Sequence, residues 1–267
     1  NSLIGNYSVA QNFVVLITFF ATPVTTMLFP AFSKLDHKKD KDTLKNVFQY
    51  SVKYAALIVV PVTAMIMALS QPAITTIFET RYTVAPLYLA LLAIPYLYTA
   101  LGNLSCVNLI NGQGQTQYNL KLTILTVAIG FPLSFVAVYS YGIVGLIVAS
   151  MIISVPGLIL SLRFIKKHYG VSMDWSSSAK ILLNSAIAAA VTYFAINLLS
   201  LNSVIQLIIG VALFTIVFLF AIIATRTINR ADLKNIHEIT KSLGPLKKPL
   251  GFLLNIVDKL ISILQPA

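Results

Sequence analysis

Long apolar stretches with almost no charge recur along this chain and limit what it can fold into. The first, residues 7–32, carries no charge before Lys34 and is about long enough to cross a bilayer as one helix, which needs roughly 20 residues. Six similar stretches follow, at residues 52–69, 84–108, 122–139, 142–162, 180–199 and 204–224. We therefore expect an all-α, polytopic membrane protein with seven spans.

The composition excludes an ordinary soluble domain. Hydrophobic residues make up 57% of the chain and charged residues only 10%, whereas soluble domains have about 25% charged residues. The net charge of +11 is typical of cytoplasmic loops that face anionic lipid, and it does not favour nucleic-acid binding. Cys106 is the only cysteine, which excludes an intrachain disulfide and a cysteine-based metal site.

The positions of the basic residues predict the orientation of the chain in the membrane. If the first residue lies outside and there are seven spans, every Lys and Arg except Arg81 falls on the inner side. Such an asymmetry fixes orientation by the positive-inside rule. We therefore expect a multi-pass protein of the cytoplasmic membrane with a cytoplasmic C-terminus.

Catalytic and metal-binding patterns are not found in the sequence. His37, His168 and His237 lie far apart in basic loops, and there is no paired-carboxylate or Ser-His-Asp arrangement. The Gly112-Gln113-Gly114 turn follows a predicted helix and lacks the strand context of a nucleotide-binding loop. No span has an acidic residue near its middle, where a proton or ion relay would need one. We expect no enzymatic activity, no cofactor and no metal.

Three short motifs carry a family resemblance: IGNYSVA at residues 4–10, LFPAFSKL at 28–35 and YGIVGLIVAS at 141–150. They resemble the polysaccharide (O-antigen type) flippases, whose superfamily also contains the MATE multidrug exporters and the lipid II flippases. In that family the first two motifs open and close the eighth span. One departure is Glu79, which stands where the family usually has glycine.

The resemblance implies a domain organisation. Residues 1–168 would form five spans of an incomplete second lobe, residues 169–226 two C-terminal spans, and residues 227–267 a cytoplasmic tail. The chain would thus correspond to spans eight to fourteen, without the N-terminal lobe of the same protein. Within the tail, apolar residues recur at helical spacing over residues 250–264, which predicts an amphipathic helix on the membrane surface.

The function implied by the resemblance is translocation of a lipid-linked oligosaccharide across the cytoplasmic membrane by alternating access. The expected partners are this lipid-linked oligosaccharide, anionic lipid at the cytoplasmic face and the missing N-terminal lobe, but no nucleic acid. Two alternatives fit the same sequence: a MATE-like cation or drug exporter, whose charged site would lie in the other lobe, and a non-transporting membrane scaffold.

Side-chain amides in two spans are the candidate substrate path. They are Asn6, Gln11 and Asn12 in the first span and Asn103 and Asn108 in the third. An unpaired amide in hydrocarbon costs about 2–7 kcal/mol, so a span that faces only lipid has no reason to hold three of them. In the resembled family the eighth span borders the central cavity. The alternative is that these amides only form hydrogen bonds with neighbouring helices.

Overall fold

The computed structural model describes residues 2–199, 201–228 and 232, and within them it contains helices and no β-strand. This confirms the all-α prediction. In chain order the elements are α1 (Ser2–Ser33), α2 (Lys41–Ala68), α3 (Ser70–Phe78), the 3₁₀ turn η1 (Glu79–Arg81), α4 (Ala85–Leu97), the 3₁₀ turn η2 (Tyr98–Leu101), α5 (Asn103–Gly112), α6 (Thr116–Tyr169), α7 (Trp175–Asn197) and α8 (Ser203–Ala224).

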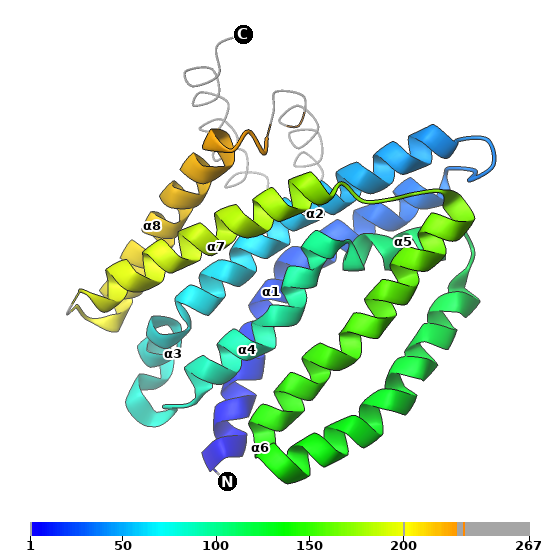
Figure 1. Ribbon diagram of the computed structural model, residues 1–267. Helices are drawn as coiled ribbons and strands as arrows, with labels where there is room; N and C mark the ends of the chain where they lie inside the picture. Colours follow the sequence, from blue (N-terminus) through cyan, green and yellow to red (C-terminus); the bar gives the residue numbers. More distant parts are fainter. Residues whose placement is uncertain (1, 200, 229–231, 233–267) are drawn as a thin grey trace.

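Helix α2 lies at the centre of the bundle. It packs against α1 and α4 on one side and against α7 on the other, and α8 packs on α7 and α3 (Figure 1). Of the long apolar helices, α2 has the largest buried share. It begins at Lys41, so it continues about three turns beyond the predicted span that starts at residue 52.

The third predicted span is broken. Instead of one helix over residues 84–108, α4 and α5 meet at a bend of 56°. The bend lies at Gly102, whose φ of +81° is the left-handed conformation that only glycine adopts at low cost. A Cβ at this position would also lie 3.3 Å from the Val52 side chain of α2, so a side chain would be tight as well as strained.

Helix α6 is a hairpin of two arms, residues 116–141 and 143–169, that meet at Gly142 (Figure 1). Gly142 has φ +59° and ψ −141°, a backbone conformation available essentially to glycine alone. The glycine that follows Tyr141 in the YGIVGLIVAS motif thus forms the turn between the two arms. Three residues later the arms pass closely, because a Cβ on Gly145 would lie 2.1 Å from the carbonyl oxygen of Ala137.

Within the described residues, five helices are long and apolar enough to cross a membrane, and the bent pair α4–α5 would make a sixth. That count takes all 54 residues of α6 as one helix. Each of its arms exceeds the roughly 20 residues that a span requires. The number of seven spans stays a prediction.

The connections between helices gather at two ends of the bundle. One end holds residues 34–40, 113–115 and 170–174, and the other holds the start of α1, residues 79–84, the turn of α6 and residues 198–199 and 201–202 (Figure 1). Alternating ends of this kind are what the predicted topology requires; the side of the membrane that each end faces stays a prediction. The predicted amphipathic helix at residues 250–264 lies outside the described residues.

Candidate functional site

An exposed stripe that mixes polar and apolar side chains runs along α1. Its polar members are Ser8, Gln11, Asn12, Thr22 and Thr26, and all five are exposed. Exposed Val15 and Phe19 lie between Asn12 and Thr22 at three- and four-residue spacing. Because residues three and four apart share a side of a helix, the stripe occupies one face of α1. The opposite face is buried against α2, α4 and α5 through Val9, Ile17 and Val24 among others.

The predicted residue Asn6 is directed away from this stripe. It is only 4% exposed, and its Oδ1 accepts hydrogen bonds from the backbone N–H groups of Val84 and Ala85, at 3.0 and 2.9 Å. The first N–H groups of a helix have no partner inside the helix, so Asn6 satisfies donors at the start of α4. This geometry is the structural alternative that the sequence left open.

Gln11 and Asn12 remain accessible. Gln11 donates from Nε2 to the hydroxyl of Tyr7, one turn earlier, at 2.8 Å. No hydrogen bond joins the Asn12 side chain to another residue in the described part of the chain. Both amides can therefore meet a ligand on the exposed face of α1.

Asn103 and Asn108 lie on α5 and are half-buried. The Nδ2 of Asn108 donates to the carbonyl oxygen of Leu104 at 2.8 Å, which ties it to its own helix. Asn108 lies one turn before Gly112, which packs against Phe29 and Phe32 at the far end of α1. The two sets of amides therefore do not form one cluster, because about 25 Å of helix separates Asn12 from that end.

Hydroxyl groups on α1 complete the stripe, and they were not among the predicted site residues. Thr22 donates to the carbonyl oxygen of Thr18 at 2.8 Å, and Thr26 donates to that of Pro23 at 2.9 Å. A threonine hydroxyl that donates to its own helix still has lone pairs free to accept. The stripe thus offers acceptors to a ligand with many hydroxyl groups. The three- and four-residue spacing of polar residues in the first span was the available signal for it.

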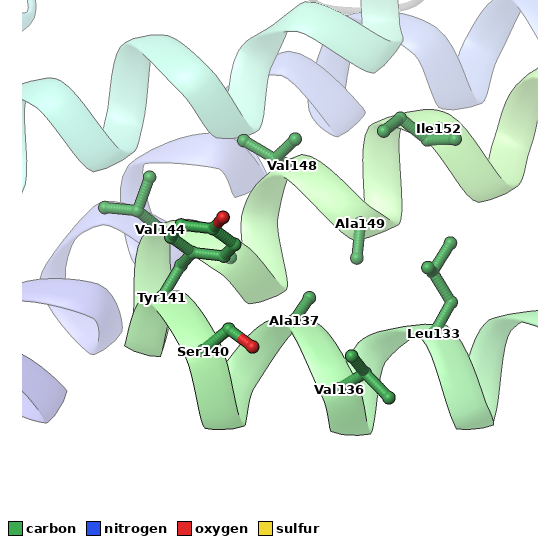
Figure 2. Close-up of a pocket in the computed structure, with 10 residues that line it drawn as sticks. Leu133, Val136, Ala137, Ser140, Tyr141, Val144, Val148, Ala149 and Ile152 are labelled. Atoms are coloured by element: carbon green, nitrogen blue, oxygen red, sulfur yellow. The ribbon is translucent and has the colours of Figure 1, made fainter.

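A second feature is an apolar pocket between the arms of α6, with a volume of about 440 Å³. Its walls include Leu133, Val136 and Ala137 from the first arm and Val148 and Ile152 from the second (Figure 2). The Ser140 and Tyr141 hydroxyls, near the turn, are the only side-chain polar groups among the lining residues. Hydrocarbon fits this pocket, whereas a sugar or a phosphate would find few partners there.

A buried polar cluster joins α7 to the segment after α8. The Nδ2 of Asn184 donates to the hydroxyls of Thr225 and Thr227, at 2.8 and 3.1 Å. Within the described residues, the Oδ1 of Asn184 and the hydroxyls of Ser185 and Thr192 are buried without a hydrogen-bond partner. The cluster holds the end of α8 against α7. No local pattern predicts it, because Asn184 is 41 and 43 residues from its two partners.

Charged groups are paired at one place in the described part of the chain. Lys53 of α2 and Asp232 approach to 2.6 Å, and the hydroxyl of Tyr54 donates to the same carboxylate at 3.2 Å. Nearby, Asp174 caps α7 by accepting from the backbone N–H of Ser176. A hydrogen bond from the Ser177 hydroxyl is the main reason that the pKa of Asp174 is lowered from its ordinary value.

Metal-binding geometry does not occur in the part of the chain that the structure describes: no three His, Cys, Asp or Glu residues are grouped there. The exposed stripe on α1 presents amide and hydroxyl groups that can form hydrogen bonds, and its polar members carry no charge.

Comparison with known proteins gives results that agree with the motifs. Residues 1–87 match a family model described as "Polysaccharide biosynthesis protein". A probable low-salt glycan biosynthesis flippase, Agl15 of Haloferax volcanii, is 23% identical over 243 residues, which is 89% of this chain and 50% of that protein. The chain spans about half the length of the curated relative it matches. No solved structure matches.

These matches confirm the resemblance to polysaccharide flippases. The apolar helices together with the flippase relative indicate a multi-pass membrane protein.

Proposed function

We propose that this chain forms part of a flippase that moves a lipid-linked oligosaccharide across the cytoplasmic membrane by alternating access. The family match over residues 1–87 and the similarity to a glycan biosynthesis flippase support the class of transporter. In this proposal residues 1–168 are the second lobe, residues 169–226 are two further spans, and residues 227–267 are a cytoplasmic tail.

The exposed polar stripe on α1 is the observation that carries the proposal. A membrane-crossing helix whose exposed face contacts only hydrocarbon should be apolar on that face, because an unpaired amide there costs about 2–7 kcal/mol. The first arm of α6 is such a helix, since Leu120, Val127, Phe131 and Phe135 are all exposed on it. Helix α1 differs by exposing Gln11 and Asn12, so we place its stripe toward a water-filled path.

The chemistry of the stripe suits a glycan. Sugars present many hydroxyl groups, which donate and accept hydrogen bonds, and the stripe presents amides and threonine oxygens. It carries no charge, so each contact is weak, and a passing substrate is not trapped. A first lobe facing α1 would close the path from the other side, and rocking of the two lobes would open it alternately, as in transporters built from repeated bundles.

The orientation proposed here follows from the charges. The start of α1 faces outward, and the end with residues 34–40 and 170–174 faces the cytoplasm. The cytoplasmic end then carries every basic residue except Arg81, as the positive-inside rule requires.

Flipping of a fluorescent lipid-linked oligosaccharide in proteoliposomes tests the proposal on the complete flippase. Asn12→Leu and Thr22→Val alter the stripe on α1, and Thr123→Val is the matched control on the first arm of α6. Thr22 and Thr123 are both exposed, and each donates its hydroxyl to the carbonyl oxygen four residues earlier. Asn108→Leu tests the half-buried amide of α5.

We expect Asn12→Leu to reduce the flipping rate about tenfold, which corresponds to the loss of one well-placed hydrogen bond of about 1.5 kcal/mol. Thr22→Val should reduce it less, and Thr123→Val should leave it unchanged. Melting temperatures should stay within a few degrees of the parent protein. Equal rates for Asn12→Leu and Thr123→Val would show that the stripe does not line the path.

A further inference from the structure

A composite basic surface lies at the end of the bundle that holds residues 34–40. We call it the basic platform and define it by six exposed residues: Lys34, Lys38, Lys39, Lys121, Arg163 and Lys167. They come from the α1–α2 connection, from the first arm of α6 and from the end of its second arm. Segments more than 120 residues apart in sequence thus contribute to one face (Figure 1).

Direct contacts bring these segments together. The ring of His37 packs edge-on against that of Tyr169, with centroids 5.4 Å apart. Gln113, in the turn before α6, donates from Nε2 to the carbonyl oxygens of Phe32 and Leu35, at 2.7 and 2.9 Å. The connection between α1 and α2 is therefore fixed to both ends of α6.

A ring stack joins the two arms of α6 beneath the platform. Tyr118 of the first arm stacks on Phe164 of the second, with centroids 3.8 Å apart, and His168 stacks on the same ring at 4.1 Å. Lys121 follows Tyr118 by three residues and Arg163 precedes Phe164, so both cations lie within one helical turn of the stack. Below it lies a fully buried core that includes Phe32, Leu109 and Ile165.

The carboxylates of Asp36 and Asp40 in the same loop offset only part of the six positive charges of the platform. Asp36 accepts a hydrogen bond from the backbone N–H of Lys38 at 2.8 Å, and Asp40 accepts from the N–H of Asp36 at 3.0 Å. Both acids thus shape the loop backbone. Among the described residues the one ion pair is Lys53–Asp232, and it involves no residue of the platform.

Exposed apolar side chains lie beside the cations of the platform. Leu120 and Ile124 flank Lys121 and are 60% and 59% exposed, and Phe29, one turn before the end of α1, is 47% exposed. A ligand that covers both surfaces needs an anionic group and a hydrocarbon part. A soluble phosphate lacks the second, and a neutral lipid lacks the first.

We propose that the basic platform binds the phosphate headgroup of an anionic membrane lipid, whose chains lie along the exposed apolar residues beside it. Lysine and arginine at the membrane surface attract such headgroups, each by about 1 kcal/mol, a factor of about five in affinity. The buried core holds together the backbone segments that carry the cations, which favours a resident lipid over a diffuse cloud of counterions. The inference does not depend on which substrate the chain transports.

Nanodiscs that contain the full chain and a trace of fluorescent phosphatidic acid test this proposal, with energy transfer from Trp175 or an attached donor as the signal. The platform variant is Lys38→Gln/Lys167→Gln. The matched control is Arg81→Glu, which changes the net charge by the same two units at the opposite end of the bundle. Arg226 and the basic residues after it are the same in both variants, so their contribution cancels.

The platform variant should bind the anionic lipid roughly tenfold to thirtyfold more weakly than the parent chain, and the control should bind within about twofold of it. A fluorescent phosphatidylcholine should show no difference among the three proteins. Equal losses in both variants would mean a general charge effect and would overturn the proposal. Full displacement of the lipid by millimolar pyrophosphate would also overturn it, because the site would then take free phosphate without the lipid chains.

Discussion

Replacing Gly145 by alanine should destabilise the fold, whereas the same replacement at Gly157 should not. Both glycines lie in the second arm of α6. A Cβ on Gly145 would lie 2.1 Å from the carbonyl oxygen and 2.7 Å from the carbonyl carbon of Ala137. A Cβ on Gly157 would meet only the Thr126 hydroxyl oxygen at 3.6 Å, an ordinary contact.

The size of the effect follows from two opposing contributions. Alanine is favoured over glycine in a helix interior by about 1 kcal/mol, and this gain is the same at both positions. At Gly145 the clash is with backbone, which cannot rotate away, so the arms must separate by about 1 Å or more. Overpacking of this kind costs about 1–3 kcal/mol. The two variants should thus differ by about 1–3 kcal/mol, or roughly 2–12 °C in melting temperature for a chain of this length.

Cys106 provides the assay. It is the only cysteine and is fully buried on α5, in the core that also contains Ile165 and Tyr169 of α6. A maleimide dye that becomes fluorescent on reaction with a thiol therefore reports unfolding as the detergent-solubilised protein is heated. Loss of the packing between α5 and α6 should expose this thiol.

A Gly145→Ala protein that melts at or above the temperature of Gly157→Ala would refute the reasoning. It would mean that the two arms of α6 do not approach as closely as the geometry requires. Gly145→Leu extends the test, since a larger side chain should also fill the apolar pocket and lower the melting temperature further.

Three further substitutions test other parts of the structure by the same melting assay. Glu79→Gly should raise the free energy of unfolding by about 0.5–2 kcal/mol. Glu79 has φ +54° and ψ −143°, and relief of about 1–3 kcal/mol of backbone strain exceeds the entropic cost of glycine. Glu79→Ala should give no such gain. Asn6→Leu should cost about 1–3 kcal/mol, because the N–H of Val84 loses its acceptor and that of Ala85 keeps only a longer bond, 3.3 Å, to the carbonyl oxygen of Tyr82. Asn12→Leu should cost little, and equal losses would contradict this distinction. Asp174→Ala should cost about 1 kcal/mol at neutral pH through loss of the α7 cap. Folding lowers the pKa of Asp174, so the ionised carboxylate stabilises the fold at pH values above its unfolded pKa of about 4, and this stabilisation is lost as the pH falls through the folded pKa. The difference in melting temperature between Asp174→Ala and the parent should therefore shrink near pH 3. A difference that stays constant with pH would contradict this account.

Periodicity and charge predicted the helical class and the order of the elements, because both depend on local sequence. A run of about 20 apolar residues has few alternatives to a buried or membrane-crossing helix. The turn at Gly142 followed from the same local chemistry, since a glycine after two tyrosines at the end of an apolar run permits a sharp reversal. The break at Gly102 was not predicted, because Pro95 was the more conspicuous residue in that span.

The candidate site was predicted less well, since it depends on which face of each helix is covered. The sequence identified Asn6, Gln11 and Asn12 as one polar set, although a helix directs neighbouring side chains about 100° apart. Contact with α4 then separates them: Asn6 is buried against Val84 and Ala85, while Gln11 and Asn12 stay exposed. Nothing in residues 1–35 alone specifies where α4 will lie.

Glu79 and Lys53 are two residues that differ from what their local sequence favours. The family resemblance predicts glycine at position 79, and the backbone there has the conformation that glycine favours. The agreement comes from independent sources, because one is a motif and the other a dihedral angle. Lys53 lies near the start of the second apolar stretch, where a lysine commonly extends to the membrane surface, but its side chain is 13% exposed and pairs with Asp232.

Burial changes what Lys53 contributes. A lysine at a bilayer interface is free to move, whereas one that is paired and mostly buried holds its partner in place, since separating them would leave a charge without compensation. Asp232 follows α8 by only a few residues, so this pair attaches the start of the C-terminal segment to α2 at the centre of the bundle. The chain thus joins its last described residue to the helix that packs against both α1 and α7.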